Sequence, residues 1–334
     1  MSQLETITIP GTGLQPTRVA LGTWAIGGWM WGGSDDADSI RTIQSAIDRG
    51  INIVDTAPVY GFGHSEEIVG RALAEGGRRQ KTIIATKVAL DWKDGKVFRN
   101  ASKARIEKEI EDSLRRLQTD VIDIYQVHWP DPTTPIAETA ESLGKLFKAG
   151  KIRAIGVSNY DVAQMEAFRA VAPLHTIQPP LNLFERGAEA DVLPYAAKHG
   201  MATLAYGPLC RGLLAGKINA SSTFTGDDLR RNDPKFKPPR FGQYLAAVAA
   251  LGAFAKTNYG KSVLDLAVRW VLDRQPLSIA LWGARRPSQL DPVAEISGWT
   301  LDQAALAAID KILAETIHDP VGPEFMAPPA RQAA

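Results

Sequence analysis

The sequence has few of the residues that form covalent or metal-bound frameworks. Its 334 residues include one cysteine, Cys210, which excludes disulfide bonds within the chain and clusters of thiolate ligands. The five histidines occur without the His-x-His or His-Glu-x-x-His spacing of catalytic metal sites, so we expect no bound metal. No apolar run approaches the roughly 18 residues that a membrane-spanning helix needs, and we expect no membrane partner.

An excess of charge of one sign is also lacking. Lysine and arginine total 38 against 37 aspartate and glutamate residues, and a net charge of +1 gives no electrostatic attraction for nucleic acid. The segment 1–13 has no basic region followed by an apolar core, so we expect no secretory signal. These absences predict a cytoplasmic protein that binds neither nucleic acid nor membrane. No pattern in the sequence predicts an oligomeric state.

What the sequence contains is a regular alternation of apolar strands and amphipathic helices. The residues around the Gly/Pro turn at 10–13 predict an N-terminal β-hairpin. Helices are expected at 36–49 and 103–117, among other segments, because isoleucine and leucine recur there at helical spacing. Eight strands are expected, at residues 20–24, 51–55, 82–87, 122–128, 153–158, 176–178, 202–206 and 278–283.

Eight buried strands, each followed by a helix, predict a parallel sheet covered on its outer face. Such a sheet closes most simply into a (β/α)8 TIM barrel, here with the N-terminal hairpin and extra C-terminal helices, as one domain over 1–334. The rival fold is an open doubly wound sheet, whose Gly-x-Gly-x-x-Gly dinucleotide motif is absent. Residues 208–241 form a long loop that could be a lid, a binding loop or a flexible insertion, and residues 318–334 are expected to be irregular.

Polar residues occur where the expected strands end. Asp55, Lys87 and His128 end the second, third and fourth strands, and Tyr60 follows Asp55 by five residues. Taken singly, each has an ordinary explanation: a helix or turn cap, a solvated lysine, a hydrogen-bonded core histidine, a packing aromatic. The carboxyl ends of barrel strands meet at one face, however, and catalytic groups cluster there. As a set, the four residues predict one functional pocket.

Five longer segments carry a family resemblance. They read INIVDTAPVYGFGHSEEIVGRAL, IIATK, DIYQVHWPD, KIRAIGVSN and AYGPLCRGLLAGK, in that order. The chain resembles the aldo-keto reductase family over nearly its whole length. LGTWAIGGWMWGG and WGARRPSQL resemble its bacterial branch, which includes the NADP-dependent glycerol dehydrogenases and glyceraldehyde reductases of acetic-acid bacteria. The resemblance implies a (β/α)8 barrel, the cofactor NADP(H) and a catalytic tetrad of Asp55, Tyr60, Lys87 and His128.

The tetrad suits the reduction of a carbonyl group. The cofactor supplies hydride, and Tyr60 would supply the proton as general acid. A unit charge at about 4 Å, at an effective dielectric constant of about 20, is worth roughly 4 kcal/mol, or up to roughly three pKa units. We therefore expect Lys87 to lower the pKa of Tyr60, and Asp55 to hold Lys87 while weakening that shift. His128 would orient the carbonyl oxygen and stabilise its developing charge.

The resemblance also assigns a cofactor site. Ser158, Asn159 and Gln178 would bind the carboxamide, and Tyr206 would stack on the nicotinamide unless it is a core tyrosine. The expected cofactor-binding residues are Gly22, Thr23, Trp24, Ser158, Asn159, Gln178, Tyr206, Gly207, Pro208, Leu209, Gly212, Lys217, Gly283, Arg285 and Gln289.

The adenosine end of the expected cofactor site departs from the family pattern. Arg285 or Arg286 would pair with the 2′-phosphate, unless the two are a solvated pair. The family often has an acidic residue followed by asparagine beyond the position of Gln289, where this chain has Pro292 and Val293. Adenine contacts and the strength of the NADP preference therefore stay open.

The expected substrate pocket is aromatic. Trp24, Trp92 and Trp129 lie on expected strand ends or loops of one face, and tryptophan packs well around small ligands. We expect an NADP-dependent reductase of small aldehydes and ketones that resemble glyceraldehyde. One alternative is polyol oxidation, such as glycerol dehydrogenation, by the same residues. The other is a non-catalytic partner protein like potassium-channel β subunits, which carry an extension before the barrel, whereas the expected hairpin here begins near residue 1.

Overall fold

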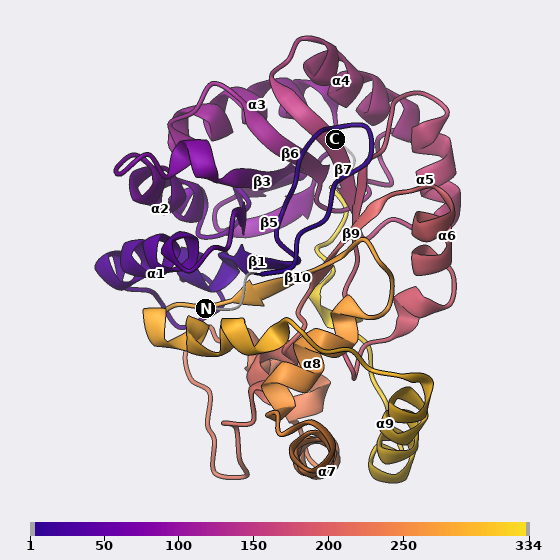
Figure 1. The fold of residues 1–334 in the computed structure, drawn as a ribbon. Coiled ribbons are helices and arrows are strands. Elements are labelled where there is room, and N and C mark those ends of the chain that lie inside the picture. The colour runs from indigo at the N-terminus through magenta and orange to yellow at the C-terminus, as the bar shows by residue number, and fades with distance from the viewer. Residues whose placement is uncertain (1–3, 332–334) are drawn as a thin grey trace.

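The computed structural model describes residues 4–331, which form a closed barrel of eight parallel strands (Figure 1). The strands follow one another around the barrel in the order β1-β10-β9-β8-β7-β6-β3-β2. Their bounds are β1 (Val19–Gly22), β2 (Ile53–Asp55), β3 (Ile83–Val88), β6 (Ile122–Val127), β7 (Ile152–Ser158), β8 (Thr176–Gln178), β9 (Ala202–Tyr206) and β10 (Ser278–Gly283). The predicted TIM barrel is confirmed, and no expected strand bound is wrong by more than two residues.

Helices surround the barrel, while α7 and α9 pack against each other outside it (Figure 1). In α3, Ile106, Ile110 and Leu117 are buried, and the Ser102 side chain accepts a hydrogen bond from the Arg105 N–H at the helix start. Two helices lie outside the regular alternation: α9 follows the last strand and is an extra C-terminal helix as expected, whereas α7 lies between β9 and β10. The bounds are α1 (Asp36–Asp48), α2 (His64–Leu73), α3 (Lys103–Leu117), α4 (Ile136–Lys148), α5 (Val162–Arg169), α6 (Val192–Lys198), α7 (Arg240–Tyr259), α8 (Val263–Leu272) and α9 (Gln303–Thr316).

The N-terminal segment pairs with itself across one end of the barrel, where Figure 1 shows the indigo loop crossing it. Thr6 and Thr17 form an antiparallel bridge, and the Ile9 N–H donates to the Leu14 carbonyl at 2.9 Å. Ile9 and Leu14 are buried and pack against barrel-interior side chains such as Ile53. The expected hairpin is present as a single bridge with flanking hydrogen bonds, and it fills the end of the barrel opposite Asp55.

A second hairpin was not expected from the sequence. Strands β4 (Leu90–Lys93) and β5 (Lys96–Arg99) pair antiparallel between β3 and α3, joined by Asp94 and Gly95, which both have positive φ. The Asp-Gly pair is a typical signal for such a two-residue turn. The hairpin therefore had a local sequence signal, which the regular alternation of strands and helices obscured.

Two irregular segments complete the mouth of the barrel. The expected loop at 208–241 contains three short 3-10 helices, at Cys210–Ala215, Leu229–Arg231 and Pro234–Phe236, and α7 begins within its last residues. We refer to residues 217–239 as the insertion. The tail from residue 318 is largely irregular, as expected, but Arg99 on β5 bridges Ala330 and its N–H donates to the Pro329 carbonyl at 3.0 Å. Residues 332–334 of the expected tail lie outside the described range.

Within residues 4–331, no helix is both long enough and apolar enough to cross a bilayer.

Candidate active site

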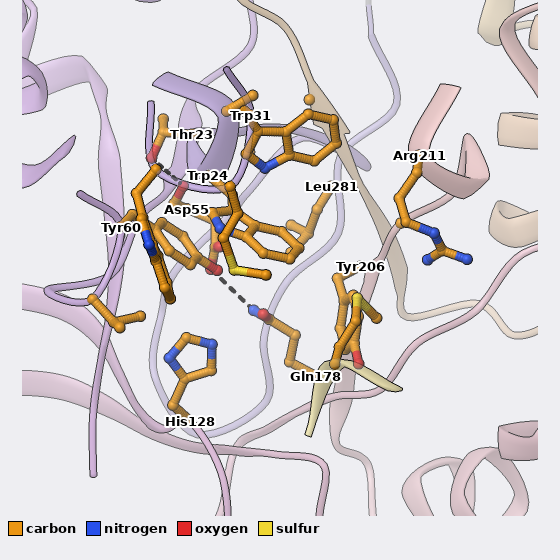
Figure 2. A pocket seen from close by; sticks show the side chains of 18 of the residues that line it. Thr23, Trp24, Trp31, Asp55, Tyr60, His128, Gln178, Tyr206, Arg211 and Leu281 are labelled. Atoms are coloured by element: carbon orange, nitrogen blue, oxygen red, sulfur yellow. Dashed lines mark hydrogen bonds between the residues drawn. The ribbon is translucent and has the colours of Figure 1, made fainter. Parts of the chain in front are cut away.

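A cavity of about 450 Å³ opens at the carboxyl ends of the barrel strands. Figure 2 shows Asp55, Tyr60, His128 and Gln178 gathered on one side of it, with Tyr206 beyond them and Arg211 farther away. Asp55 ends β2, Gln178 ends β8 and Tyr206 ends β9, so strand ends from distant parts of the chain meet here. The predicted strand-end residues Asp55, His128, Gln178 and Tyr206 line this cavity, and Lys87 does not.

Lys87 is buried behind the cavity-lining residues Asp55 and Tyr60 and joins these two predicted catalytic residues. Its Nζ donates to Asp55 Oδ1 at 2.6 Å, to the Thr56 carbonyl at 3.0 Å and to the Tyr60 hydroxyl at 3.2 Å. The Lys87 side chain is 0% exposed, and Asp55 is 3% exposed. A buried ammonium needs such partners, because an unpaired charge in the interior is very costly.

Tyr60 is held over Lys87 by a tight approach between two loops. Gly61, the next residue, has a φ of +69°, and a Cβ there would lie 2.2 Å from the carbonyl oxygen of Gly27. A Cβ on Gly27 would lie 2.5 Å from the carbonyl carbon of Tyr60. Only glycine at both positions allows this approach. The sequence therefore sets the phenol position through two residues that carry no side chain.

The electrostatics of Tyr60 differ from the expectation. Burial, and then the Asp55 carboxylate, raise the pKa of Tyr60 well above its usual value of 10.0. The predicted lowering by Lys87 is wrong for this structure, because the ammonium is paired with Asp55 and the phenol is buried. The pKa of Lys87 is itself lowered by burial, against the opposing effect of Asp55. Tyr60 consequently stays protonated, which is the form that a general acid requires.

His128 follows β6 and faces the Tyr60 ring. The two ring centroids are 5.7 Å apart at 83°. Burial, and then the Lys87 charge, hold the pKa of His128 well below its usual value of 6.5, so the imidazole is neutral. Within residues 4–331 its ring nitrogens have no hydrogen-bond partner, and the half-buried ring lines the cavity. One nitrogen of a neutral imidazole can then donate to a bound ligand.

Two glutamines fix the second oxygen of Asp55. Gln178 Nε2 donates to Asp55 Oδ2 at 2.9 Å, and Gln126 Nε2 lies 3.4 Å from the same oxygen. Gln178 was expected to bind the nicotinamide carboxamide; it lines the cavity but here holds the carboxylate. Gln126 was not predicted. Gln126 lies on β6, two residues before His128, which follows the strand. Side chains two residues apart in a strand point to the same side, so this spacing from His128 could have identified Gln126.

Most of the expected cofactor residues line the cavity. Lys217 does not: it is exposed, beyond the last residue of the turn that follows β9. The expected cofactor residues that line the cavity are Gly22, Thr23, Trp24, Ser158, Asn159, Gln178, Tyr206, Gly207, Pro208, Leu209, Gly212, Gly283, Arg285 and Gln289.

A chain of hydrogen bonds fixes the wall between Tyr206 and His128. The Tyr206 hydroxyl donates to Asn159 Oδ1 at 3.0 Å, and Asn159 Nδ2 donates to the His128 carbonyl at 3.0 Å. Ser158 Oγ donates to the Gln178 carbonyl at 2.7 Å. The aromatic face of Tyr206 is therefore held at a defined angle, as a stacking surface requires.

The turn after β9 carries backbone strain. Cys210, Arg211 and Gly212 have consecutive φ values of 44°, 53° and 95°, in the left-handed region. For a non-glycine residue this costs about 1–3 kcal/mol. The Arg211 guanidinium is buried and paired with Glu185 and with Asp233, which stabilises the strained turn. Arg211 also lines the cavity, although no role was predicted for it.

Two arginines lie at the other end of the cavity. Arg285 Nη1 donates to the Trp31 carbonyl at 3.0 Å, and its backbone N–H donates to Gln289 Oε1 at 2.8 Å. The Arg230 guanidinium, on the insertion, lies 5.5 Å from the Trp31 ring centroid. Burial, and then the Arg230 charge, lower the pKa of Arg285, against the opposing effect of Asp228. Arg230 is paired with Asp228, which accepts from its Nε at 2.9 Å and from its Nη2 at 2.5 Å. Of the two, Arg285 is therefore the cation that is not already paired with a carboxylate within residues 4–331, and Arg230 was not predicted.

Arg286, the other arginine considered for the 2′-phosphate, is exposed and does not line the cavity.

The aromatic wall is only partly the expected one. Trp24 stacks on Tyr60 with centroids 5.9 Å apart, and Trp129 lines the cavity. Trp92 does not line it. The centroid of the Phe62 ring lies 5.0 Å from that of Trp29, which lines the cavity, and 5.6 Å from that of Trp92. The expectation that Trp92 lines the substrate pocket is therefore wrong for this structure.

Trp29 and Trp31 line the cavity in addition to the expected tryptophans.

The tail supplies a wall that the sequence did not predict. Met326, Pro328 and Pro329 line the cavity. Arg99 Nε donates to the Pro328 carbonyl at 2.8 Å, and Lys235 Nζ donates to the Gly322 carbonyl at 3.1 Å. The tail is thus held at two points, one on each side of Met326 in the sequence.

The cavity thus brings together the Tyr60 phenol, the His128 imidazole and the Arg285 guanidinium. Among the described residues, no group of three or more His, Cys, Asp and Glu side chains is placed to hold a metal ion. The Aldo/keto reductase family model matches residues 18–314, and the chain belongs to that family.

Proteins similar to this chain are described as acting on different substrates. The aldo-keto reductase YhdN of Bacillus subtilis is 61% identical over 329 residues, 98% of this chain and 99% of that protein. The structure of the glycerol dehydrogenase AKR11B4 from Gluconobacter oxydans is 59% identical, covers 96% of this chain and 99% of that one, and has a TM-score of 0.88. The NADH-specific methylglyoxal reductase of Escherichia coli is 34% identical over 86% of this chain and 91% of that protein.

NADP(H) is the typical cofactor of the family. A solved aldo/keto reductase from Klebsiella pneumoniae, in complex with NADP and acetate, is 28% identical, covers 93% of this chain and 95% of that one, and has a TM-score of 0.71.

Proposed function

We propose that this protein is an NADP(H)-dependent reductase of small aldehydes and ketones of about the size of glyceraldehyde. One observation carries the proposal: Lys87 Nζ lies within hydrogen-bond distance of both Asp55 and the Tyr60 hydroxyl at the base of the cavity. That arrangement can supply a proton to a bound carbonyl oxygen and stabilise the phenolate that remains.

The chain's own residues account for the proton side of the reaction. The bound dinucleotide supplies hydride to the carbonyl carbon. Tyr60 gives its proton to the carbonyl oxygen, and the resulting phenolate lies 3.2 Å from the Lys87 ammonium. Asp55 keeps Lys87 charged in its buried position. Neutral His128 donates a second hydrogen bond to the carbonyl oxygen and fixes its direction.

The two cavity arginines support a preference for NADPH over NADH. Arg285 and Arg230 would pair with the 2′-phosphate, while Tyr206 would stack on the nicotinamide at the other end. The preference is proposed for this chain alone, since an Escherichia coli relative is described as NADH-specific. The substitution of Pro292 and Val293 for the usual adenine contacts would leave the phosphate as the main recognition element.

The direction of the reaction has a second candidate. The similarity to the glycerol dehydrogenase of Gluconobacter oxydans favours oxidation of glycerol or a similar polyol by the same residues in reverse. A partner role like that of a channel subunit has no supporting observation within residues 4–331. The lone thiol, Cys210, which is buried, and the proposed use of NADPH support a cytoplasmic location as part of the proposal.

The test is direct. Purified protein is mixed with NADPH or NADH and DL-glyceraldehyde, and the absorbance of the reduced nicotinamide is followed, with Tyr60→Phe as the matched variant. Turnover with NADPH that the variant loses supports the proposal. Turnover with NADH alone would remove Arg285 as a phosphate ligand, and no turnover with any short aldehyde or ketone would refute the proposed reaction. Oxidation of glycerol with NADP+ tests the reverse direction.

A further inference from the structure

A cluster of four buried, charged side chains lies at the strained turn that follows β9. Its members are Glu185, Arg211, Asp233 and Lys235, and none is more than 7% exposed. They come from three segments: the loop after β8, the strained turn after β9, and the insertion. Two carboxylates face two cations, so the cluster is neutral as a whole.

The contacts within the cluster are extensive. Arg211 donates to both carboxylate oxygens of Glu185 through its two Nη atoms, and to Asp233 through Nε. Lys235 Nζ donates to Glu185 Oε1 at 2.8 Å and lies 3.8 Å from Asp233 Oδ1. Burial opposes the charge of Arg211, but Cys210, Glu185 and Asp233 raise its pKa, so the guanidinium stays charged.

The cluster connects four parts of the molecule. Asn182 Nδ2 donates to Glu185 Oε2 at 2.8 Å and to the Gly207 carbonyl at 2.9 Å, which ties the β8 loop to the turn after β9. Lys235 reaches the Gly322 carbonyl of the tail. The Arg211 guanidinium lies 5.6 Å from the centroid of the Phe325 ring.

The insertion has a second attachment, to the segment that follows β1. The Asp227 carboxylate accepts solvent-exposed hydrogen bonds from the backbone N–H groups of Met30 and Gly32, at 2.8 and 3.0 Å, which compete with water and contribute little. Leu229 is fully buried beside them, and its N–H donates to the Met30 carbonyl at 2.9 Å. The charge cluster is therefore one of two buried attachments of the insertion, and it is the one that joins the insertion to the turn at 210–212.

We propose that this four-charge cluster is a positioning device for cofactor binding: it keeps the strained turn at 210–212 in place and joins the insertion to it. The inference rests on the proposed use of NADP(H). Three cavity-lining residues are on these connected segments, Arg211 and Gly212 on the turn and Arg230 on the insertion. If the turn and the insertion were not already ordered, binding would have to supply the cost of ordering both, and the cofactor would dissociate faster.

The test is a charge-balanced double variant, Asp233→Asn with Lys235→Met. It removes one acid and one base, leaves Glu185 paired with Arg211, and disconnects the insertion from the turn. The dissociation constant and the release rate of NADPH are measured on the free protein by the change in NADPH fluorescence. We expect the dissociation constant to rise about tenfold, which corresponds to about 1.4 kcal/mol, mainly through faster release.

The matched control is another charge-balanced pair, Arg79→Met with Asp123→Asn. These two residues form an ion pair at 3.2 Å near the starts of β3 and β6, at the other end of the barrel, and neither lines the cavity. The control should lower the thermal unfolding midpoint without changing NADPH affinity. Equal weakening of NADPH binding in both variants, or unchanged binding in the first, would overturn the inference. A wild-type protein that binds no NADPH would instead refute the proposed function.

A measurement on the wild-type protein covers the case in which the double variant does not fold. NADPH binding should slow amide hydrogen exchange at residues 182–187, which contain Glu185 and do not line the cavity. Coupling between sites is reciprocal, so a cluster that favours binding is itself stabilised by binding. Unchanged exchange in this loop, when NADPH is bound, would contradict the proposed connection.

Discussion

Lys87 is the residue on which the proposed proton transfer depends most directly. It has no exposed surface and donates to both Asp55 and Tyr60. We expect Lys87→Met to lower kcat for glyceraldehyde by about 10²- to 10⁴-fold, because the Tyr60 phenolate would lose its ammonium partner. Steady-state kinetics with NADPH measure this loss. Lys81→Met, an exposed lysine at the other end of β3, should leave kcat unchanged, and wild-type kcat in the Lys87 variant would contradict the assigned role.

His128 and Tyr60 set the expected pH profile of reduction. Burial and the Lys87 charge hold the pKa of His128 well below 6.5, while burial and Asp55 hold the pKa of Tyr60 well above 10.0. Both groups are then neutral and carry their protons between about pH 6 and about pH 9. We expect kcat for reduction to be constant across this window. A clear rise or fall of kcat through neutral pH would show that one of the two pKa values lies inside it.

Arg285 and Arg286 are neighbours in sequence with different positions, which makes them a matched pair. Arg285 lines the cavity beside Arg230, whereas Arg286 is exposed and outside it. We expect Arg285→Gln to lower kcat/KM for NADPH about tenfold or more, with little change for NADH, since only NADPH carries the 2′-phosphate. Arg286→Gln should change neither value by much. An equal loss with both cofactors would assign Arg285 a role in cavity shape.

At the scale of elements, one arginine of α3 makes three contacts with the β4–β5 hairpin. Arg105 donates to the Leu90 carbonyl at 3.1 Å, pairs with Asp91 at 3.0 Å and lies 5.1 Å from the Trp92 ring centroid. Leu90 lines the cavity, so these contacts position part of the substrate wall.

We therefore expect Arg105→Met to raise KM for glyceraldehyde while leaving the NADPH dissociation constant unchanged. The variant should also lose about 3 kcal/mol of unfolding free energy, because Glu109 loses one of its two buried partners. Kinetics and urea unfolding measure the two effects. Lys103→Gln, an exposed residue of the same helix, is the control for both. A weaker NADPH affinity in the Arg105 variant would mean that the hairpin also shapes the cofactor end.

At the scale of the whole molecule, the barrel interior is a packed core. Leu204 is fully buried there, in one cluster with Ile53, Ile124 and Ile279. Leu204→Ala should lower the free energy of unfolding by about 2–5 kcal/mol, since the cavity that it leaves inside a closed barrel can collapse only partly. Urea unfolding measures the change. Val171→Ala, at a side chain 42% exposed, should cost much less, and equal costs would mean that the interior is loosely packed.

The sequence predicted the barrel and the place of the tetrad because both depend on local patterns. Apolar strands that end in Asp55 or Lys87 can be recognised one at a time. Met326 in the tail and Arg230 in the insertion reach the cavity only through long-range contacts, which no local spacing encodes. The pKa of Tyr60 was mispredicted for a similar reason: the sequence identifies the lysine next to the phenol, but not how completely both are buried.

The pairing of β1 with β10 gives the order of synthesis a particular importance. Val19 lies opposite Ala280, so the first barrel strand to leave the ribosome gains its second neighbour only when nearly all the chain has been made. Until then the growing chain has two unpaired strand edges, which are sites for misassociation. The wall formed by Met326, Pro328 and Pro329 comes later still. A ribosome that stops early would therefore release a chain that has most of its catalytic residues and an incomplete cavity.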